Sequence, residues 1–257
     1  MSIVLYEVKD RIAYITLNRA EKRNALNSEM VSLLKKAFMD AETAVDVKVI
    51  VLKAAGDNFC AGADLEYLKL LQQNSYDNNL EDSISLMELF KLIYSMKKVV
   101  IAQVHGHAIA GGCGLVSVCD FAFAVPDANF GYSEVKIGFI PAIVMVFLLR
   151  KIGEAKAKAL LLSGNFIDAA KANEYGLVFE VVSEGSLEQS VYDFARKLCR
   201  SNSGKSMELI KKMISEIPSM TFEDALQYAC RQNAEARSSE DCKKGIDSFL
   251  NKRKLEW

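Results

Sequence analysis

The sequence predicts an α/β fold with a helical C-terminal region, and two observations support this prediction. First, apolar runs of strand length, Val47–Ala54 and Val99–Val104, stand between segments of helical periodicity. Strands that alternate with helices in this way are typical of an α/β core with covered sheets. Second, every segment beyond Ser186 has helical spacing, and none of them has the pattern of a strand.

The first part of the chain predicts a hairpin followed by a helix. Two β-patterned runs, Ile3–Val8 and Ile12–Leu17, are separated by three residues, which is typical of a tight hairpin. Apolar residues at three- and four-residue spacing over residues 30–41 predict the helix. We expect Ser28 to be its N-cap, although Asn27 would also serve.

The middle of the chain repeats the order of strand, turn and helix. The polar stretch Gln72–Asp82 predicts a loop, and Ile84–Met96 predicts an amphipathic helix. Shorter strands are expected at Phe121–Val125, from Asn129 onward and at Leu177–Val182. Further helices are expected at residues 142–149, 155–162, 168–175, 187–200, 205–216, 222–236 and 240–254. The helices of the last third have no strand to pack on, so they need another partner.

The composition excludes several classes of protein. With 51% hydrophobic residues in a chain of 257, a large core is expected and wholesale disorder is excluded. The formal net charge of −1 argues against a nucleic-acid partner held by a broad basic face. No run approaches the ~18 apolar residues of a membrane span, and the N-terminus lacks the pattern of a signal peptide. The 6 cysteines are scattered without CxxC pairs, so we expect reduced thiols and a cytoplasmic protein.

Two glycine-containing turns, residues 59–65 and 107–115, follow the two buried strands. Free backbone N–H groups at the start of a helix bind anions, so two such turns could direct two donors at one oxygen, as in an oxyanion hole. The second turn lacks the Gly-Lys-Ser/Thr of a phosphate-binding loop and the spacing of a dinucleotide fingerprint. Taken singly, each turn is better explained structurally. Asp64 would be an N-cap in the first, and the second would allow close packing of a helix on a strand.

Glu134 is the candidate acid or base. It follows a short strand inside the mostly apolar stretch 132–141, where burial would raise the pKa of a carboxyl group toward the range useful for proton transfer. The alternative is a surface glutamate paired with Lys136 or Lys151.

Two further features of the sequence are better explained by structural roles. His105 and His107 would share one face of a strand, but no third metal ligand lies nearby, so we interpret them as structural or pocket-lining and expect no metal. The basic run at residues 252–254 is typical of a solvated helix end, although it could also meet a ligand phosphate.

Together, in this order and spacing, these segments resemble the enoyl-CoA hydratase/isomerase (crotonase) superfamily. The resemblance runs from residues 17–26 (LNRAEKRNAL) to residues 245–254 (GIDSFLNKRK), which is essentially the whole chain. It implies a ClpP-like spiral of ββα turns over residues 1–185 that binds an acyl-CoA. It also implies a helical region over residues 186–257 that builds homotrimers, usually paired into hexamers. Neighbouring subunits would then be the partner that the last helices need.

The resemblance further implies an acyl-CoA thioester as substrate, with coenzyme A as part of it and no separate cofactor. The thioester oxygen would lie between the backbone N–H groups of Ala63 and Gly111, and Glu134 would be the acid or base. The substrate-binding residues that it implies are Lys22, Arg23, Ala25, Ala61, Asp64, Leu65, Gly112, Gly114, Pro141, Ala142, Phe249 and Lys252. Phe249 and Lys252 would reach the CoA of a neighbouring subunit.

One departure from the family pattern leaves the reaction open. Family hydratases commonly carry two glutamates that hold and activate water, and Gly114 stands where one of them would be. A single carboxylate favours isomerisation, because it can remove a proton from a 3-enoyl thioester and return it two carbons along. Residues 112–116 and 133–142, however, resemble bacterial methylglutaconyl-CoA hydratases of leucine breakdown. We therefore rank hydration of a 2-enoyl-CoA first, a Δ3,Δ2-enoyl-CoA isomerase second and a non-catalytic acyl-CoA-binding protein third.

Another carboxylate can fill the second position only if the fold brings one there. Glu66, Glu81 and Glu88 are the candidates. The polar stretch Gln72–Asp82 and the apolar run Ala142–Leu149 are expected to line the acyl pocket.

Overall fold

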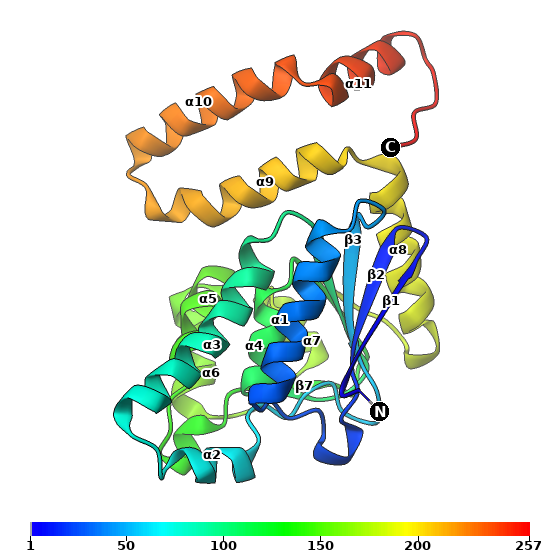
Figure 1. The fold of residues 1–257 in the computed structure, drawn as a ribbon. Helices are drawn as coiled ribbons and strands as arrows, with labels where there is room; N and C mark the ends of the chain where they lie inside the picture. The colour runs from blue at the N-terminus through cyan, green and yellow to red at the C-terminus, as the bar shows by residue number, and fades with distance from the viewer. Residues whose placement is uncertain (1) are drawn as a thin grey trace.

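The computed structural model describes residues 2–257 as an α/β core with long helices at one end (Figure 1). Its central sheet has the strand order β1-β2-β3-β4-β6-β9, in which only the β1–β2 pair is antiparallel. These strands are β1 (Val4–Lys9), β2 (Ile12–Leu17), β3 (Val49–Ala54), β4 (Val99–Val104), β6 (Phe121–Ala124) and β9 (Glu180–Val181). A small second sheet contains β5 (Ala108–Ile109), β7 (Asn129–Gly131) and β8 (Ile167–Asp168). The prediction of an α/β fold is confirmed.

The helices surround this core and extend beyond it. Those of the core are α1 (Ser28–Thr43), α2 (Leu65–Leu71), α3 (Tyr76–Ser95), α4 (Gly111–Val118), α5 (Ala142–Ile152), α6 (Glu154–Ser163) and α7 (Ala169–Tyr175). The C-terminal ones are α8 (Leu187–Ser201), α9 (Gly204–Glu216), α10 (Phe222–Ser238) and α11 (Glu240–Leu250). Short 3-10 turns are η1 (Ala20–Lys22), η2 (Glu134–Ile137), η3 (Glu184–Ser186) and η4 (Ile217–Ser219). Within residues 2–257, no helix has both the length and the apolar character needed to cross a membrane.

The predicted hairpin and buried strands are confirmed, and their sequences explain them. Asp10 and Arg11 at the β1–β2 turn both have positive φ, 55° and 66°, as a two-residue turn between twisted strands requires. Nearly every residue of β2, β3 and β4 is buried. Continuous apolar runs are needed there because parallel strands are covered on both faces.

The polar stretch Gln72–Asp82 is a correction, because most of it is helical and only its beginning is a loop. α3 begins at Tyr76, with the Ser75 hydroxyl accepting the Asn78 N–H at 3.3 Å. The helix buries only Leu89, Phe90 and Ile93, all in its second half. The polar first half therefore continues a helix that is stabilised by packing further along the chain, which composition alone does not reveal.

Three boundaries also differ from the sequence prediction. The N-cap of α1 is Asn27 rather than Ser28, because the Asn27 side chain accepts the Met30 N–H at 2.9 Å. The last strand, expected over Leu177–Val182, is reduced to the two residues of β9. The last helix ends at Leu250 rather than Lys254.

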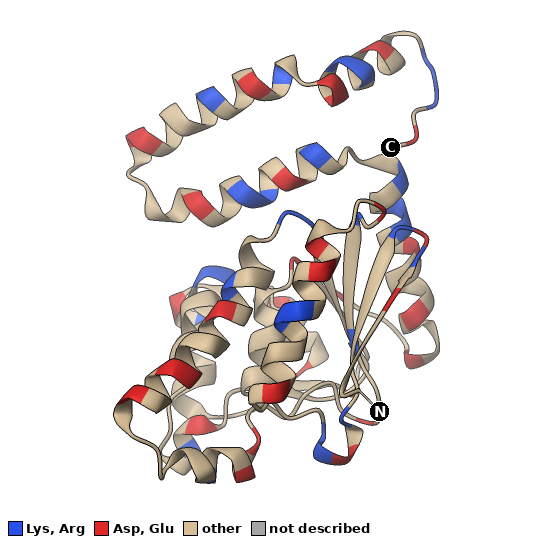
Figure 2. Cartoon of the chain, viewed as in Figure 1, with Lys and Arg blue, Asp and Glu red and all other residues tan. Residues whose placement is uncertain are grey.

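The expectation that the last third has no strand to pack on is wrong for α8. This helix packs on β2, β3, β4 and β6 and buries Leu187, Val191, Ala195 and Cys199. By contrast, α10 and α11 contain no fully buried residue and extend away from the core (Figure 1). Charges of both signs alternate along them (Figure 2). The need for a partner therefore applies to α10 and α11, and the division into residues 1–185 and 186–257 stays a prediction.

Candidate active site

The two glycine turns predicted to carry chemistry lie against each other beyond the carboxyl ends of β3 and β4. The Cys60 N–H donates to the His107 carbonyl oxygen at 3.1 Å, and the Ile109 N–H donates to the Cys60 carbonyl oxygen at 2.9 Å. A Cβ at Gly112 would lie 2.2 Å from the Cys60 carbonyl oxygen. Gly112 is therefore required for the close approach of α4 to the first turn.

Ala63 and Gly111 leave backbone N–H groups unused at this junction. Around Ala63 the neighbouring groups are paired, since the Leu26 N–H donates to the Gly62 carbonyl at 2.7 Å and the Asp64 N–H donates to the Leu26 carbonyl at 2.8 Å. Within residues 2–257, neither the Ala63 N–H nor the Gly111 N–H at the start of α4 has a hydrogen-bond acceptor. The turns are close together, because an ideal Cβ on Gly62 would lie 3.2 Å from the Gly111 nitrogen.

Ala110, between these turns, has a backbone conformation that residues with a side chain seldom adopt, with φ 52° and ψ −122°. Two hydrogen bonds hold it there. Its N–H donates to the Gly131 carbonyl of β7 at 2.8 Å, and its carbonyl accepts the Gly114 N–H of α4 at 2.9 Å. The surrounding structure therefore fixes the strained turn that places the Gly111 N–H.

Asp64 is the N-cap of α2, as its structural interpretation predicts. Its carboxylate accepts the N–H groups of Glu66 at 3.0 Å and Tyr67 at 3.3 Å and pairs with Arg19 at 2.8 Å. Burial alone would raise the pKa of Asp64, but the Arg19 guanidinium and the two backbone N–H groups hold it below its usual value. The Asp64 carboxylate is therefore engaged inside the protein, as is its backbone N–H, which donates to the Leu26 carbonyl.

Glu134 begins η2 and is partly buried, and burial raises the pKa of its carboxyl group. Its buried Oε2 has no hydrogen-bond partner within residues 2–257. The alternative of a surface ion pair is wrong. Lys136 lies over the Phe166 ring at 5.5 Å, and the Lys151 ammonium donates to the Cys119 carbonyl at 2.5 Å. The carboxylate is therefore available for a ligand.

Gly114 is buried on α4, and Val144 of α5 fills the space beside it. A Cβ at Gly114 would lie 2.3 Å from Val144 Cγ1 and 3.3 Å from Phe90 Cε1. A glutamate at residue 114 would therefore require Val144 to move. Glu66 and Glu88 do not supply the missing carboxylate, because they pair with Lys22 at 2.9 Å and with Lys35 at 3.0 Å, and Glu81 is exposed.

Comparison with known proteins assigns the family. A family model described as enoyl-CoA hydratase/isomerase matches residues 7–257. The chain belongs to this family. Its α/β fold of ββα units with C-terminal helices is the crotonase fold, and family members bind acyl-CoA substrates.

Similar proteins cover almost the whole chain. A Thermus thermophilus protein, named provisionally as an enoyl-CoA hydratase, is 38% identical over 95% of this chain and 96% of its own length. The short-chain-enoyl-CoA hydratase of Clostridium acetobutylicum is 31% identical over 98% of this chain and 96% of its own length. The solved structure of an enoyl-CoA hydratase from Mycobacterium smegmatis superposes with a TM-score of 0.93 at 29% identity, covering 100% of this chain and 99% of the other. None of these three names specifies methylglutaconyl-CoA.

The other predicted substrate-binding residues of this family member fall into two groups. The first lies around the glycine turns. The Ala61 N–H donates to the Arg23 carbonyl at 3.0 Å, and Ala25 and Leu65 belong to the same pair of segments. Pro141 and Ala142 lie at the start of α5, a helix that packs on α4. The second group, Phe249 and Lys252, lies around the end of α11, on the side of the molecule away from α2 (Figure 1). Within one chain the second group is therefore separate from the glycine turns.

The histidine rings bond to nearby backbone. His105 Nε2 lies 2.6 Å from the Gly56 carbonyl oxygen, and His107 Nδ1 accepts the Asn129 N–H at 3.2 Å. Across the described residues 2–257, no three His, Cys, Asp or Glu side chains are arranged to hold a metal ion.

Two residues that shape the site, Asn24 and Val144, were not singled out individually by the sequence pattern. The Asn24 side chain is fully buried, donates to the carbonyls of Ala55 and Asn58 at 2.8 Å each and accepts the Arg19 N–H at 2.8 Å. These hydrogen bonds connect the η1 segment to the residues just before the first glycine turn. A polar residue inside the motif of residues 17–26 was the available signal, whereas nothing in the sequence marks Val144.

Proposed function

We propose that this protein is an enoyl-CoA hydratase that adds water to a 2-enoyl-CoA thioester. The observation that carries the proposal is the junction of two unused backbone donors, on Ala63 and Gly111, in a chain that also holds the unpaired carboxylate of Glu134. The relatives named as enoyl-CoA hydratases, at 31% and 38% identity, support it.

In the proposed mechanism, the thioester oxygen accepts hydrogen bonds from Ala63 and Gly111. Negative charge develops on this oxygen as water adds to the β-carbon, and fixed N–H donors stabilise that charge without reorganising. Glu134 gives a proton to the α-carbon and takes one from the water that adds to the β-carbon, so the carboxyl group returns to its starting state. Its raised pKa supports this role, because proton transfer is most efficient when the pKa of the group approaches the working pH.

A second candidate, Δ3,Δ2-enoyl-CoA isomerisation, is favoured by Gly114 and Val144. Val144 fills the space where a side chain at residue 114 would lie. A reaction that moves one proton between two carbons needs one carboxylate, and Glu134 would suffice.

A panel of thioesters distinguishes these reactions. The protein is incubated with a short 2-enoyl-CoA, 3-methylglutaconyl-CoA and a 3-enoyl-CoA, and the enoyl absorbance is followed with product analysis. Loss of the enoyl absorbance of the short 2-enoyl-CoA or of 3-methylglutaconyl-CoA supports hydration. Turnover of 3-methylglutaconyl-CoA also tests the resemblance of residues 112–116 and 133–142 to methylglutaconyl-CoA hydratases. Conversion of only the 3-enoyl-CoA would replace hydration with isomerisation.

The first prediction is that Glu134→Gln lowers turnover by about 10²-fold or more, the scale of general acid–base catalysis. Glu184→Gln, at an exposed glutamate in η3, is the matched control and should retain the wild-type rate. Turnover unaffected by Glu134→Gln would contradict the assigned role. No turnover of any panel member by the wild-type protein, with acyl-CoA still bound, would favour the non-catalytic alternative.

We propose further that the CoA lies along the backbone of residues 22–26 and 60–64, with Gly112, Pro141 and Ala142 nearer the acyl chain. Phe249 and Lys252 would complete the site of a neighbouring subunit, which requires a homotrimer or a pair of trimers. A reducing compartment such as the cytoplasm is supported by the 6 cysteines, all of them free thiols.

A further inference from the structure

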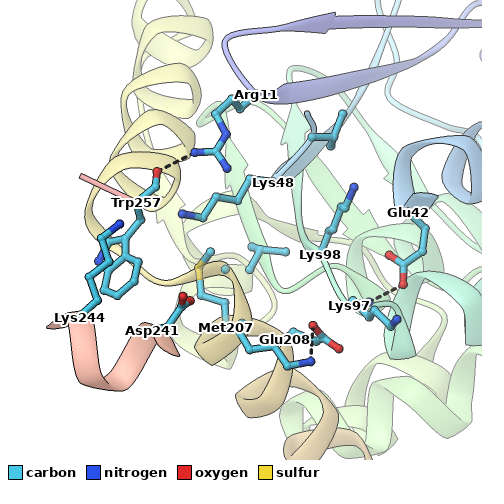
Figure 3. A pocket seen from close by; sticks show the side chains of 14 residues that line it. Arg11, Glu42, Lys48, Lys97, Lys98, Met207, Glu208, Asp241, Lys244 and Trp257 are labelled. Atoms are coloured by element: carbon cyan, nitrogen blue, oxygen red, sulfur yellow. Dashed lines mark hydrogen bonds and ion pairs between the residues drawn. The ribbon is translucent and has the colours of Figure 1, made fainter. Parts of the chain in front are cut away.

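A cavity of about 410 Å³ lies at the end of the sheet opposite to the glycine turns (Figure 3). Lys48 stands just before β3 and Lys98 just before β4, so the cavity is at the amino ends of the two strands whose carboxyl ends lead to the glycine turns. The first turn of α9, α11 and Trp257 close its other sides. It is therefore separate from the proposed acyl-CoA site.

The walls of this cavity carry more positive than negative charge. Its cations are Arg11, Lys48, Lys97, Lys98, Lys205 and Lys244. Its three acids, Glu42, Glu208 and Asp241, are all engaged. Glu42 accepts the backbone N–H of Lys97 at 2.9 Å, Glu208 pairs with Lys205 at 3.1 Å, and Asp241 accepts the Ser203 hydroxyl at 2.5 Å. Six cations against three acidic side chains leave an excess of about three positive charges, although the Arg11 guanidinium also donates to the Trp257 main-chain oxygen at 2.6 Å.

Two of these lysines also have a structural role, which does not remove their charge. Lys48, only 7% exposed, donates to the carbonyls of Cys199 and Asn202 at 2.8 and 2.5 Å, at the end of α8. Lys98 likewise donates to the Ala41 carbonyl at 2.6 Å, at the end of α1. The partial charge of a helix end offsets only about half of an ammonium charge. Neither lysine forms an ion pair within residues 2–257.

The remaining groups around the cavity also favour an anion. Lys97 and Lys244 are exposed, and neither side chain forms an ion pair within the described chain. Gly204 and Lys205, whose N–H groups begin α9, line the cavity, and the amino end of a helix attracts negative charge. Burial lowers the pKa of Lys48, with Arg11 adding repulsion, and burial lowers that of Lys98. A bound anion would favour the charged form of both lysines.

We propose that this cavity binds a compact polyanion of the phosphate class, of which inorganic pyrophosphate is the simplest example. Ammonium and guanidinium groups line one cavity and are the usual donors to phosphate oxygens, and their excess charge matches a multivalent anion better than chloride. The volume of the cavity, about 410 Å³, suits a small ligand better than a nucleic-acid duplex.

The test is calorimetric titration of the intact protein with sodium pyrophosphate at constant ionic strength. We expect saturable binding of one pyrophosphate per chain. The chain has 1 tryptophan, Trp257, and it lines the cavity, so its fluorescence should change over the same concentration range. Orthophosphate and glycerol phosphate, titrated separately, distinguish an inorganic ligand from a phosphate ester.

The double variant Lys97→Gln/Lys244→Gln should bind pyrophosphate about tenfold more weakly, because it loses two charge-assisted contacts. The bond from Lys97 to Glu42 comes from the backbone, so this variant keeps it. Lys158→Gln on α6, whose side chain pairs with Glu154, is the control and should bind like wild type. The proposal is overturned if wild-type binding is not saturable, if sodium chloride has the same effect, or if the double variant binds as tightly as the control.

Discussion

At the scale of single residues, Glu134 combines burial with the lack of a partner. The residue is partly buried, and its buried Oε2 accepts no hydrogen bond within residues 2–257. A carboxylate in such a place lowers the stability of the fold, and this cost is common at sites of proton transfer. The same feature that supports a catalytic role therefore has a consequence for unfolding.

Glu134→Gln should raise the thermal stability of the protein near neutral pH. Burial raises the folded-state pKa of Glu134 above its ordinary value of 4.5, so the folded protein binds the proton more tightly than the unfolded chain. The charged carboxylate therefore destabilises the fold at pH values above the folded pKa. This penalty disappears as the pH falls below the unfolded value.

Melting temperatures of wild type and Glu134→Gln, measured from about pH 4 to pH 8, check this expectation. The difference should be largest at the upper end and vanish at the lower end. Glu184→Gln is the control and should match wild type throughout. A glutamine variant less stable than wild type at neutral pH would contradict the cost assigned to the buried carboxylate.

Gly114 and Val144 form the other decisive pair at this scale. Gly114→Glu alone should destabilise the fold by about 1–3 kcal/mol, the usual cost of overpacking a core, because its Cβ meets Val144 Cγ1. Gly114→Glu/Val144→Ala should recover part of that stability. It should also raise the ratio of hydration to isomerisation, since a second carboxylate can then hold water. Denaturant unfolding and the thioester panel measure the two effects, and equal stability of the single and double variants would show that Val144 does not limit the space.

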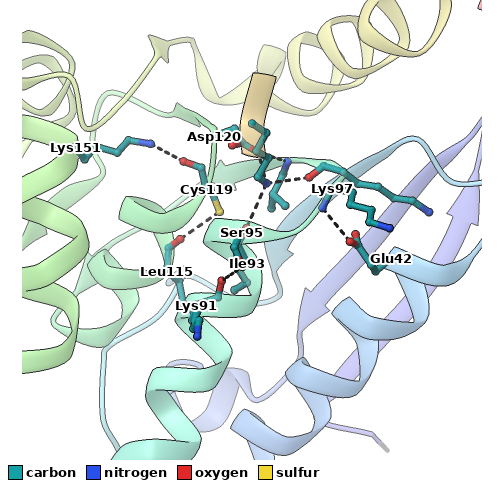
Figure 4. A network of polar contacts seen from close by, with 12 residues as sticks. Glu42, Lys91, Ile93, Ser95, Lys97, Leu115, Cys119, Asp120 and Lys151 are labelled. Atoms are coloured by element: carbon teal, nitrogen blue, oxygen red, sulfur yellow. Dashed lines mark hydrogen bonds and ion pairs between the residues drawn. The ribbon is translucent and has the colours of Figure 1, made fainter. Parts of the chain in front are cut away.

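At the scale of secondary-structure elements, a buried ion pair connects α9 to the central sheet. The Lys211 ammonium of α9, only 6% exposed, lies 2.7 Å from the Asp120 carboxylate just before β6 and also donates to the carbonyls of Lys98 and Ile93. The same Asp120 oxygen accepts the Val100 N–H of β4 at 2.7 Å, at the centre of a larger polar network (Figure 4). The pair thus fixes α9 relative to β4 and β6.

Asp120→Ala should cost about 3 kcal/mol of stability, because it leaves the Lys211 charge buried without its partner. The double variant Asp120→Ala/Lys211→Met should regain much of this, since neither charge then remains. Lys212→Met, at the exposed neighbouring position, is the control and should change stability by less than about 0.5 kcal/mol. Chemical denaturation of wild type, of the single variants Asp120→Ala and Lys211→Met and of the double variant gives the coupling, and additive effects of the two single changes would contradict it.

At the scale of the whole molecule, the C-terminal helices carry apolar side chains that the chain itself does not cover. Phe222 and Leu226 of α10 are 73% and 52% exposed, and Phe249 of α11 is 85% exposed. An exposed apolar surface of this kind indicates contact with another chain. The proposed homotrimer would cover these helices.

We therefore predict that the protein sediments as three or six chains. Phe222→Glu/Leu226→Glu, one helical turn apart, should shift the sedimenting mass toward that of one chain, because charges would be buried in the interface. Asn233→Glu, an exposed change on the same helix, should leave the assembly intact. A wild-type protein that sediments as a single chain at micromolar concentration would exclude the proposed assembly.

Most of the elements could be predicted from the sequence, because they depend on nearby residues. The apolar runs at β3 and β4 fixed the buried strands, and the spacing over residues 30–41 fixed α1. The first half of α3 could not be predicted, because its polar residues take the helical state through packing of Leu89, Phe90 and Ile93 further along the chain. The exposure of β1 at the edge of the sheet could not be predicted either, because it depends on which strands become its neighbours. The packing of α8 on the sheet likewise joins segments that are distant in the chain.

By itself the sequence determined the α/β order of elements, the two glycine turns and the isolated Glu134, since each is written in a short stretch of chain. Only the tertiary structure decided that the turns carrying the unused N–H groups of Ala63 and Gly111 lie close together and that Val144 fills the space beside Gly114. It also decided that six cations from distant parts of the chain line one cavity. These features join residues that are far apart along the chain. Their positions follow from packing and from hydrogen bonds between distant segments, which no local pattern encodes.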